Sequence, residues 1–191
     1  MSLTLIHGPM FSSKTTELYR NASRCKAAGL NVLSITHALD TRSFGTHAGE
    51  DHYENTIKLP QLRDIFSLPQ YQTCEVIIVD EAQFFNDLKD TVIHMVDMDH
   101  KQLVVAGLDG DFQRNKFGQI LDLIPVADKC MKLSAICKDC LQEQRIQDRN
   151  GMLHNLPPAT FTKRIIAQNA DNIVIGGSES YKAVCRKHYH E

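Results

Sequence analysis

The chain has 191 residues, a hydrophobic share of 42% and a net charge of −2, which predict one globular domain with at most a small appendage. The near-neutral charge argues against a nucleic-acid binder, and no apolar run reaches the roughly 20 residues that span a membrane. The cysteine pattern, in a chain of this length, favours metal binding in a reducing cytosol over a disulfide scaffold.

The N-terminal segment predicts a phosphate-binding loop. An apolar strand at residues 3–6 leads into a tight turn, and a helix is expected over residues 15–26, ended by Gly29. Backbone N–H groups in such a turn, next to a helix N-terminus, bind anions. The loop residues expected to contact the nucleotide are Gly8, Pro9, Met10, Phe11, Ser12, Ser13, Lys14, Thr15 and Thr16.

Two loop positions carry most of the expected chemistry, and one departs from the usual pattern. Lys14 is expected at the β- and γ-phosphates and Thr15 at Mg²⁺. Ser13 stands where the pattern G-x-x-x-x-G-K-[ST] has its second glycine. If that position needs a positive φ, serine there costs roughly 1 kcal/mol. The alternative interpretation is an ordinary strand–turn–helix with a chance lysine.

The rest of the first 135 residues alternates strands with helices. Strands are expected at 31–36, 76–79 and 102–106, a polar loop region at 37–54, a short helix at 62–68, and a helix capped by Asn86 that runs to about Asp99. This alternation predicts an α/β fold, a P-loop three-layer core with a parallel sheet and right-handed crossovers. The composition changes after Ala135, so we expect a nucleotide-binding domain over residues 1–135 and a zinc-ribbon domain over 136–191.

Paired carboxylates follow the β-branched run at residues 76–79. Asp80 can hold Mg²⁺, directly or through water, and Glu81 can take a proton from an attacking hydroxyl group. The simpler alternative is that strand ends often carry solvated acids. Because the phosphate loop lies about 65 residues upstream, the pair favours nucleotide chemistry.

Two ligand pairs near the C-terminus predict a metal site. Cys137-x-x-Cys140 and Cys185-x-x-His188 have the spacing of two hairpin-like knuckles that close a tetrahedral, structural Zn²⁺ site. A redox-active CxxC is one alternative, and His190 is an alternative to His188 as the fourth ligand.

These motifs, in this order, resemble the type II thymidine kinases, and the likeness runs from Leu3 to His188. The segments that carry it are Gly8-Pro-Met-Phe-Ser-Ser-Lys-Thr-Thr-Glu-Leu18, Asp40-Thr-Arg42 with Thr46-His47, Asp80-Glu-Ala-Gln-Phe-Phe85, Ala106–Gly118, Phe161-Thr-Lys-Arg164, Val174–Tyr181 and Val184-Cys-Arg-Lys-His188.

The resemblance implies transfer of the ATP γ-phosphoryl group to the 5′-hydroxyl of thymidine. It makes Glu81 the general base, adds Arg42 and Gln83 to the cofactor-binding residues, and places Phe112 against the thymine ring and Phe84 in the pocket wall. Met10, Leu108, Thr162 and Tyr181 are implied around the 5-methyl group. A lasso loop, with Val174, Ile175, Gly176 and Tyr181, is implied to hold the base through backbone groups.

The family also implies ATP, Mg²⁺, a structural Zn²⁺ and a homo-oligomer, a tetramer, while the net charge and the lack of a long apolar run predict no nucleic-acid or membrane partner. One methyl group is worth only about 1–3 kcal/mol, so some use of deoxyuridine is expected. Ser13 leaves an alternative open: a catalytically impaired nucleotide-binding relative of the same fold. The interval Leu141–Ala159 departs from compact members and is expected to form an extended hairpin.

Overall fold

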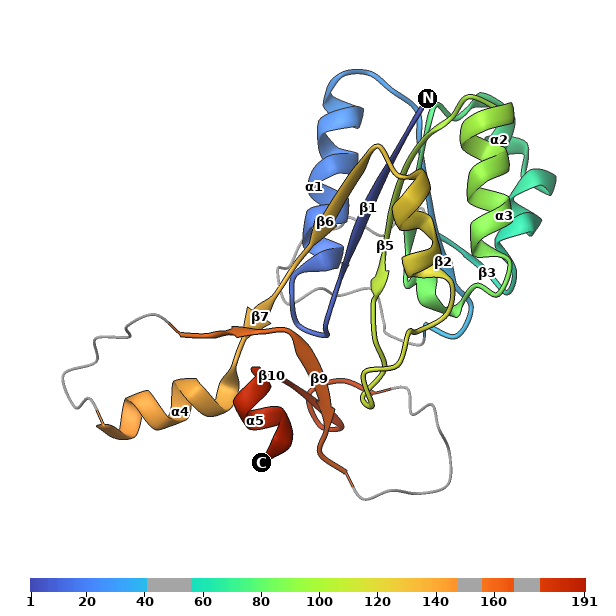
Figure 1. Ribbon diagram of the computed structural model, residues 1–191. Coiled ribbons are helices and arrows are strands. Elements are labelled where there is room, and N and C mark those ends of the chain that lie inside the picture. The colour runs from blue at the N-terminus through green and yellow to red at the C-terminus, as the bar shows by residue number, and fades with distance from the viewer. Residues whose placement is uncertain (41–55, 148–155, 167–175) are drawn as a thin grey trace.

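The computed structural model describes residues 1–40, 56–147, 156–166 and 176–191 (Figure 1). The strands are β1 (Ser2–Gly8), β2 (Val32–His37), β3 (Thr56–Leu59), β4 (Val76–Asp80), β5 (Gln102–Leu108), β6 (Lys129–Lys132), β7 (Ala135–Ile136), β8 (Pro158–Ala159), β9 (Phe161–Arg164) and β10 (Tyr181–Val184). The α-helices are α1 (Lys14–Ala27), α2 (Pro69–Thr73), α3 (Leu88–Ile93), α4 (Lys138–Gln147) and α5 (Arg186–His190). The 3₁₀-helices are η1 (Leu62–Ser67), η2 (Ala82–Phe84) and η4 (Ile120–Val126), and η3 (His94–Met98) is a π-helix.

A six-stranded sheet in the order β3-β2-β4-β5-β1-β6 forms the centre of the molecule, and every neighbouring pair is parallel. Helix α1 lies on one face, and α2, α3 and η4 lie on the other (Figure 1). The predicted three-layer α/β core with a parallel sheet is therefore confirmed. None of the helices within the described ranges is both long and apolar enough to cross a membrane.

Strands β4 and β5 have continuous apolar runs because both of their faces are covered. In β5, Leu103 and Val105 join the larger hydrophobic cluster on the α3 face, whereas Val104 and Ala106 join the smaller cluster beneath α1. Successive side chains of a strand point to opposite faces, so burial on both sides requires a continuous apolar run. This explains why these strands could be predicted from composition alone.

The helix expected from Asn86 to about Asp99 starts later, and its last part, up to Met98, is a π-helix. Helix α3 begins at Leu88 with Asp87 as its N-cap residue, and the chain continues beyond Ile93 as the π-helix η3. The capping role predicted for Asn86 is therefore wrong. The Asp87 carboxylate instead accepts hydrogen bonds from the backbone N–H groups of Leu62 and Arg63, at 3.0 and 2.9 Å. It ties α3 to η1, a long-range contact that local sequence does not indicate.

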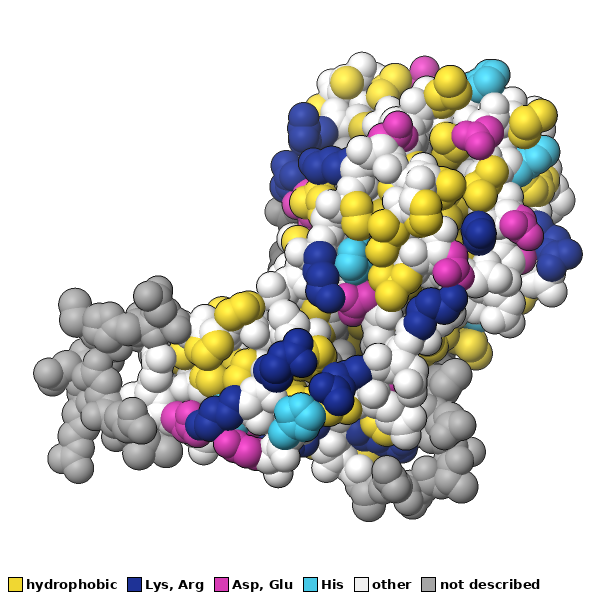
Figure 2. Space-filling model, viewed as in Figure 1, with side chains coloured by type: hydrophobic (Ala, Val, Ile, Leu, Met, Phe, Trp, Pro, Cys, Tyr) yellow, Lys and Arg dark blue, Asp and Glu magenta, His cyan; other side chains and the backbone are white. Residues whose placement is uncertain are grey.

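The C-terminal part projects away from the sheet (Figure 2) and has two small antiparallel ladders, β7 with β8 and β9 with β10. The hairpin expected over Leu141–Ala159 is wrong in its described first part, because α4 continues to Gln147. Within the described ranges of this part, Leu156, Phe161 and Tyr189 pack, partly buried, against a cluster of buried side chains: Ala135, Cys137, Cys140, Ala159, Ala183, Val184 and Cys185. The domain boundary near Ala135 stays a prediction.

Candidate functional site

The register of the parallel sheet brings the chemically important strand ends to one edge. Gly8 at the end of β1 pairs with Leu108 at the end of β5, and Thr36 in β2 pairs with Asp80 at the end of β4. Since parallel strands end on the same side, the phosphate loop, the carboxylate pair and the segment after β5 meet at this edge. This is the usual ligand-binding edge of an open α/β sheet.

The loop after β1 folds tightly over its own backbone. A Cβ atom on Gly8, whose φ is +152°, would lie 2.4 Å from the carbonyl oxygen of Leu133, so only glycine fits there. Ser13 has φ 62° and ψ 28°, in the left-handed region, directly before α1. The buried Lys14 donates a hydrogen bond from Nζ to the carbonyl oxygen of Pro9 at 2.7 Å. The predicted turn is present, and Ser13 adopts the positive φ that raised the question of strain.

Thr15 and Asp80 are joined across this edge, although 65 positions separate them in the sequence. The Thr15 hydroxyl donates to Asp80 Oδ2 at 2.9 Å, and Asp80 Oδ1 accepts from the backbone N–H of Glu81 at 2.9 Å. A hydroxyl and a carboxylate are the hard oxygen ligands that Mg²⁺ prefers, directly or through water. The residues present therefore fit the cation that nucleotide chemistry requires.

The side-chain amide of Gln83 binds Glu81 through its nitrogen and the backbone of Leu108 through its oxygen. Gln83 Nε2 donates to Glu81 Oε2 at 2.6 Å, and Gln83 Oε1 accepts from the backbone N–H of Leu108 at 2.9 Å. Gly118 packs so closely on Gln83 that an added Cβ would lie 2.1 Å from its carbonyl oxygen. Gln83 thus positions the carboxylate of Glu81, a contact that the sequence did not indicate, and its role in cofactor binding stays a prediction.

The ring of Phe84, three positions after Glu81, packs against two other aromatic rings. The Phe84 ring lies edge-on to Phe117, with centroids 5.5 Å apart, and 5.7 Å from the ring of His37. His37 is buried at the end of β2 and was not predicted as part of the site. Its Nδ1 accepts from the backbone N–H of Leu39 at 3.0 Å, so its Nε2–H donates to the carbonyl of Pro60 at 3.1 Å. The Nδ1 contact needs a neutral ring, because a protonated Nδ1 could not accept from Leu39.

Strand β9 lies against the loop of β1 and the segment after β5. The Thr162 hydroxyl accepts a hydrogen bond from the backbone N–H of Met10 at 3.0 Å, and the Arg164 guanidinium lies 5.4 Å from the centre of the Phe112 ring. Tyr181 in β10 pairs with Arg164 in the antiparallel ladder. Four residues expected around a substrate, Met10, Phe112, Thr162 and Tyr181, are thus connected through one short strand.

Some predicted site residues cannot be placed in this geometry. Arg42, Val174 and Ile175 lie outside the described residues. Gly176 is the first described residue of its segment, and a Cβ added to it would lie 2.5 Å from Ser180 Oγ. Leu108 is half-buried at the end of β5, where its backbone N–H binds Gln83.

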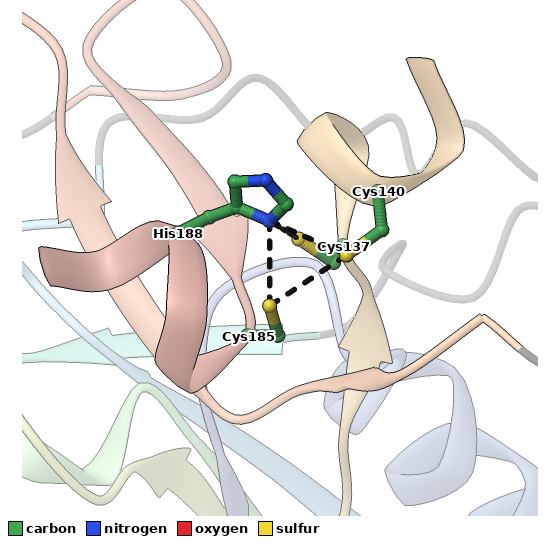
Figure 3. A group of neighbouring side chains, drawn as sticks. All are labelled: Cys137, Cys140, Cys185 and His188. Carbon is green, nitrogen blue, oxygen red and sulfur yellow. Dashed lines mark hydrogen bonds between the residues drawn. The ribbon is translucent and has the colours of Figure 1, made fainter. Parts of the chain in front are cut away.

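The predicted metal ligands converge on one point (Figure 3). His188 Nδ1 lies 3.3 to 3.5 Å from the sulfur atoms of Cys137, Cys140 and Cys185, and the last two sulfurs are 3.6 Å apart. Ligands arranged tetrahedrally around Zn²⁺ at about 2.1 to 2.3 Å are roughly 3.5 to 3.8 Å apart. All four residues are buried, so the donor set and its spacing fit a closed, structural zinc ion.

The local structure around these ligands differs from the predicted hairpin knuckles, which is a correction. Cys137 immediately precedes α4, and Cys185 is the N-cap residue of α5, so each pair sits at a helix N-terminus. A helix N-terminus favours thiolate over thiol. Glu143 Oε1 lies 3.0 Å from the other ring nitrogen of His188, an orienting contact typical of metal-bound imidazoles. His190 is exposed and lies outside the cluster.

Comparisons with known proteins agree with this geometry. A family model described as thymidine kinase matches residues 1–189. The chain is 38% identical over 190 residues to the cytosolic thymidine kinase of Bos taurus, a match covering 98% of this chain and 71% of that protein. It is 38% identical to thymidine kinase a of Arabidopsis thaliana, covering 97% and 73%. It is 36% identical to the thymidine kinase of Variola virus, covering 98% and 96%.

Replacing Ser13 with glycine should stabilise the fold, because glycine adopts a positive φ without strain. We expect Ser13→Gly to raise the free energy of unfolding by about 1 kcal/mol in urea denaturation. Ser23→Gly is the matched control, since Ser23 is exposed within α1 and should lose about 0.5 to 1 kcal/mol. Destabilisation by both substitutions would mean that the Ser13 backbone is not strained.

His37 should make stability depend on pH. Burial lowers the pKa of His37 from its usual value of 6.5, so the unfolded chain takes up a proton more readily than the folded one. The contribution of the neutral ring is complete above about pH 6.5 and is lost as the pH falls through the lowered pKa. His37→Gln, which keeps a donor and an acceptor, should show a flatter decline in unfolding free energy below pH 6.5. Parallel curves for both proteins would contradict this.

Proposed function

We propose that this chain, which belongs to the thymidine kinase family, transfers the γ-phosphoryl group of ATP to the 5′-hydroxyl of thymidine with Glu81 as general base. The chain is a kinase that phosphorylates thymidine, and the proposal adds the roles of its residues. The observation that carries these roles is the Glu81 carboxylate, held by Gln83 beside the Thr15–Asp80 pair.

In the proposed reaction, the Glu81 carboxylate takes the proton of the 5′-hydroxyl as that oxygen attacks the γ-phosphorus. The new bond joins the 5′-oxygen to phosphorus, the bond to the β–γ bridging oxygen breaks, and ADP leaves. Lys14 and the N–H groups of the loop after β1 hold the phosphates. Because phosphoryl transfer needs little covalent help from the protein, positioning and charge stabilisation supply most of the catalysis.

The Thr15 hydroxyl and the Asp80 carboxylate are proposed to hold Mg²⁺. When bound, the cation neutralises charge that develops on the phosphate oxygens. The hydrogen bond between Thr15 and Asp80 keeps the hydroxyl and carboxylate oxygens next to each other at the carboxyl-terminal edge of the sheet. Loop residues on either side of this pair, from Gly8 to Thr16, and Arg42 are proposed to complete the nucleotide site.

The thymine-binding part of the site is proposed to lie between β9, the loop after β1 and the segment after β5. Phe112 would face the ring, Phe84 would line the pocket, and Met10, Leu108, Thr162 and Tyr181 would surround the 5-methyl group. The residues Val174, Ile175 and Gly176 would hold the base through their backbone groups. We also propose a homo-tetramer, on family membership alone.

A structural Zn²⁺ is proposed at Cys137, Cys140, Cys185 and His188. The buried cluster in the described C-terminal residues is small, with Leu156, Phe161 and Tyr189 only partly buried against it, and small cores are commonly stabilised by a metal or a covalent link. By joining the start of α4 to the end of β10, the ion would fix the β9–β10 ladder that reaches the candidate site.

The central test of the proposal is Glu81→Gln. The amide keeps an oxygen that can accept from Gln83 but takes no proton, so kcat should fall by about 10²- to 10⁴-fold. Thymidine binding, measured by calorimetry, should change little. Glu75→Gln is the matched control, an exposed carboxylate just before the same strand. Full turnover by Glu81→Gln, or the absence of thymidine phosphorylation by the wild type, would refute the assignment.

Metal analysis should find about one Zn²⁺ per chain, and Cys140→Ser should lose most of it. Cys130→Ser is the control, because Cys130 is an exposed cysteine of β6 that lies outside the cluster. Chelation should raise amide hydrogen exchange in β9 and β10 before it does so in β4 and β5, since binding energy of the metal is folding energy of its unit. Equal metal content in both variants would exclude this site.

A further inference from the structure

Tyr189 contacts the backbone of the residue proposed to face the base. Its hydroxyl donates a hydrogen bond to the carbonyl oxygen of Phe112 at 2.9 Å, a contact between residues 77 positions apart. Tyr189 lies in α5, directly after the metal-cluster residue His188. Because a backbone carbonyl is part of the main chain, this bond restrains the path of the chain at Phe112 itself.

The segment between β5 and η4 forms a compact turn with Arg114 at its tip. Asp111 Oδ1 accepts from the backbone N–H groups of Gln113 and Asn115, each at 2.8 Å, and an isolated bridge joins Gly110 to Lys116. Arg114 has φ 68°, which is unfavourable for arginine. These internal hydrogen bonds make the turn rigid, so contacts at its tip can fix the orientation of the whole turn.

The tip of this turn rests on aromatic rings of the C-terminal part. The Arg114 guanidinium lies 4.4 Å from the centre of the Tyr189 ring and 5.6 Å from that of Phe161, and the Arg186 guanidinium lies 4.9 Å from the centre of the Phe161 ring. The Phe161 and Tyr189 rings are 5.5 Å apart. Stacked guanidinium and aromatic groups attract one another by cation–π interaction, so these two rings fix the position of the tip of the turn.

Strand β9 connects the Phe161 and Tyr189 rings to Phe112 by a second route. Phe161 belongs to the stack, and three positions later Arg164 lies over the Phe112 ring at 5.4 Å. Lys163 Nζ donates to the carbonyl oxygen of His188 at 2.9 Å, which joins β9 to α5. Phe112 is therefore restrained through its carbonyl by α5 and through its ring by β9.

We propose that Tyr189 is a positioning residue for thymidine: it holds Phe112 in the orientation that receives the base, and thereby couples the C-terminal metal-cluster part to nucleoside affinity. This inference rests on the proposed function, because it takes Phe112 as the residue that faces thymine. Tyr189 acts through the backbone of Phe112. Its loss should therefore weaken thymidine binding and leave ATP binding and the proton transfer to Glu81 unchanged.

Tyr189→Phe tests the hydrogen bond alone, because the ring that receives Arg114 remains. We expect the KM for thymidine to rise roughly two- to tenfold, as for loss of one hydrogen bond, with kcat and the KM for ATP changed by less than about twofold. Without any nucleoside, amide hydrogen exchange in residues 109–118 should accelerate. Zinc content and Tm should equal those of the wild type.

Tyr71→Phe is the matched control, since Tyr71 also loses a hydroxyl that hydrogen-bonds to another part of the chain, at Asp99 in the segment that precedes β5. It should leave the KM for thymidine and the exchange of 109–118 unchanged. Arg114→Gly, which suits a positive φ but removes the cation, should shift both readouts in the same direction as Tyr189→Phe.

The outcomes separate this inference from the proposed function. If the wild type fails to phosphorylate thymidine, the proposed function fails, whereas faster exchange in 109–118 of Tyr189→Phe would still establish the restraint on the turn. If exchange in 109–118 is unchanged, the positioning role is overturned even in an active enzyme. Equal rises in the KM values for thymidine and ATP, together with a lower Tm, would show a general structural role and also overturn it.

Discussion

The parallel register of β1, β4 and β5 is the constraint on which the candidate site depends. It is stabilised by side chains far from any chemistry, such as Leu103 and Val104, which bury opposite faces of the same strand. Each fully buried aliphatic side chain contributes about 1.5 to 3 kcal/mol, and a one-residue slip would move every side chain to the opposite face and disrupt the packing of both clusters. That rigidity places the Thr15 hydroxyl 2.9 Å from Asp80, and a hydrogen bond of this kind alone, worth about 1 kcal/mol, could not hold two distant segments together.

The C-terminal part differs from the sheet in the interactions that stabilise it. Among the described residues, its buried cluster consists of alanine, valine and cysteine side chains, with Leu156, Phe161 and Tyr189 partly buried against it, which is a small core compared with that of the sheet. The Zn²⁺ proposed at its four buried ligands would add binding free energy to the stability of this part. The unit then reaches the sheet through specific polar and cation–π contacts, at Met10, Phe112 and Arg114, and not through a shared hydrophobic core. Such contacts are directional, as the positioning role proposed for Tyr189 requires.

The sequence predicted those features that follow from local pattern. Continuous apolar runs gave the central strands, and the spacing of Cys137, Cys140, Cys185 and His188 gave a cluster that the structure brings together. The sequence did not predict contacts that depend on tertiary packing. Gln83, Tyr189 and the Asp87 carboxylate are ordinary polar residues until the fold brings a backbone N–H or C=O to each of them. Helix α4 was missed because its polar composition and the nearby Asn-Gly turn signal favoured a hairpin.

One signal was present in the sequence and was not used. Glu143 follows Cys140 by three positions, the spacing that puts two side chains on the same side of a helix. Had α4 been predicted as a helix, a carboxylate beside the metal ligands would have been expected, and it indeed lies 3.0 Å from His188 Nε2. The error in secondary structure therefore concealed a functional contact.

The distribution of backbone strain supports the same location for function. Five non-glycine residues in the described part of the chain have positive φ, and four of them, Phe11, Ser13, Glu81 and Arg114, lie in the loop after β1, directly after β4 or in the turn after β5. At about 1 kcal/mol each, these four cost about 4 kcal/mol, a large share of the 5 to 15 kcal/mol that stabilises a typical domain. Strain of that size persists only where surrounding contacts impose it, here the Gln83 amide at Glu81 and the ring of Tyr189 at Arg114. The contacts that hold Glu81 and the Phe112 turn in place are thus the ones that keep these unfavourable conformations.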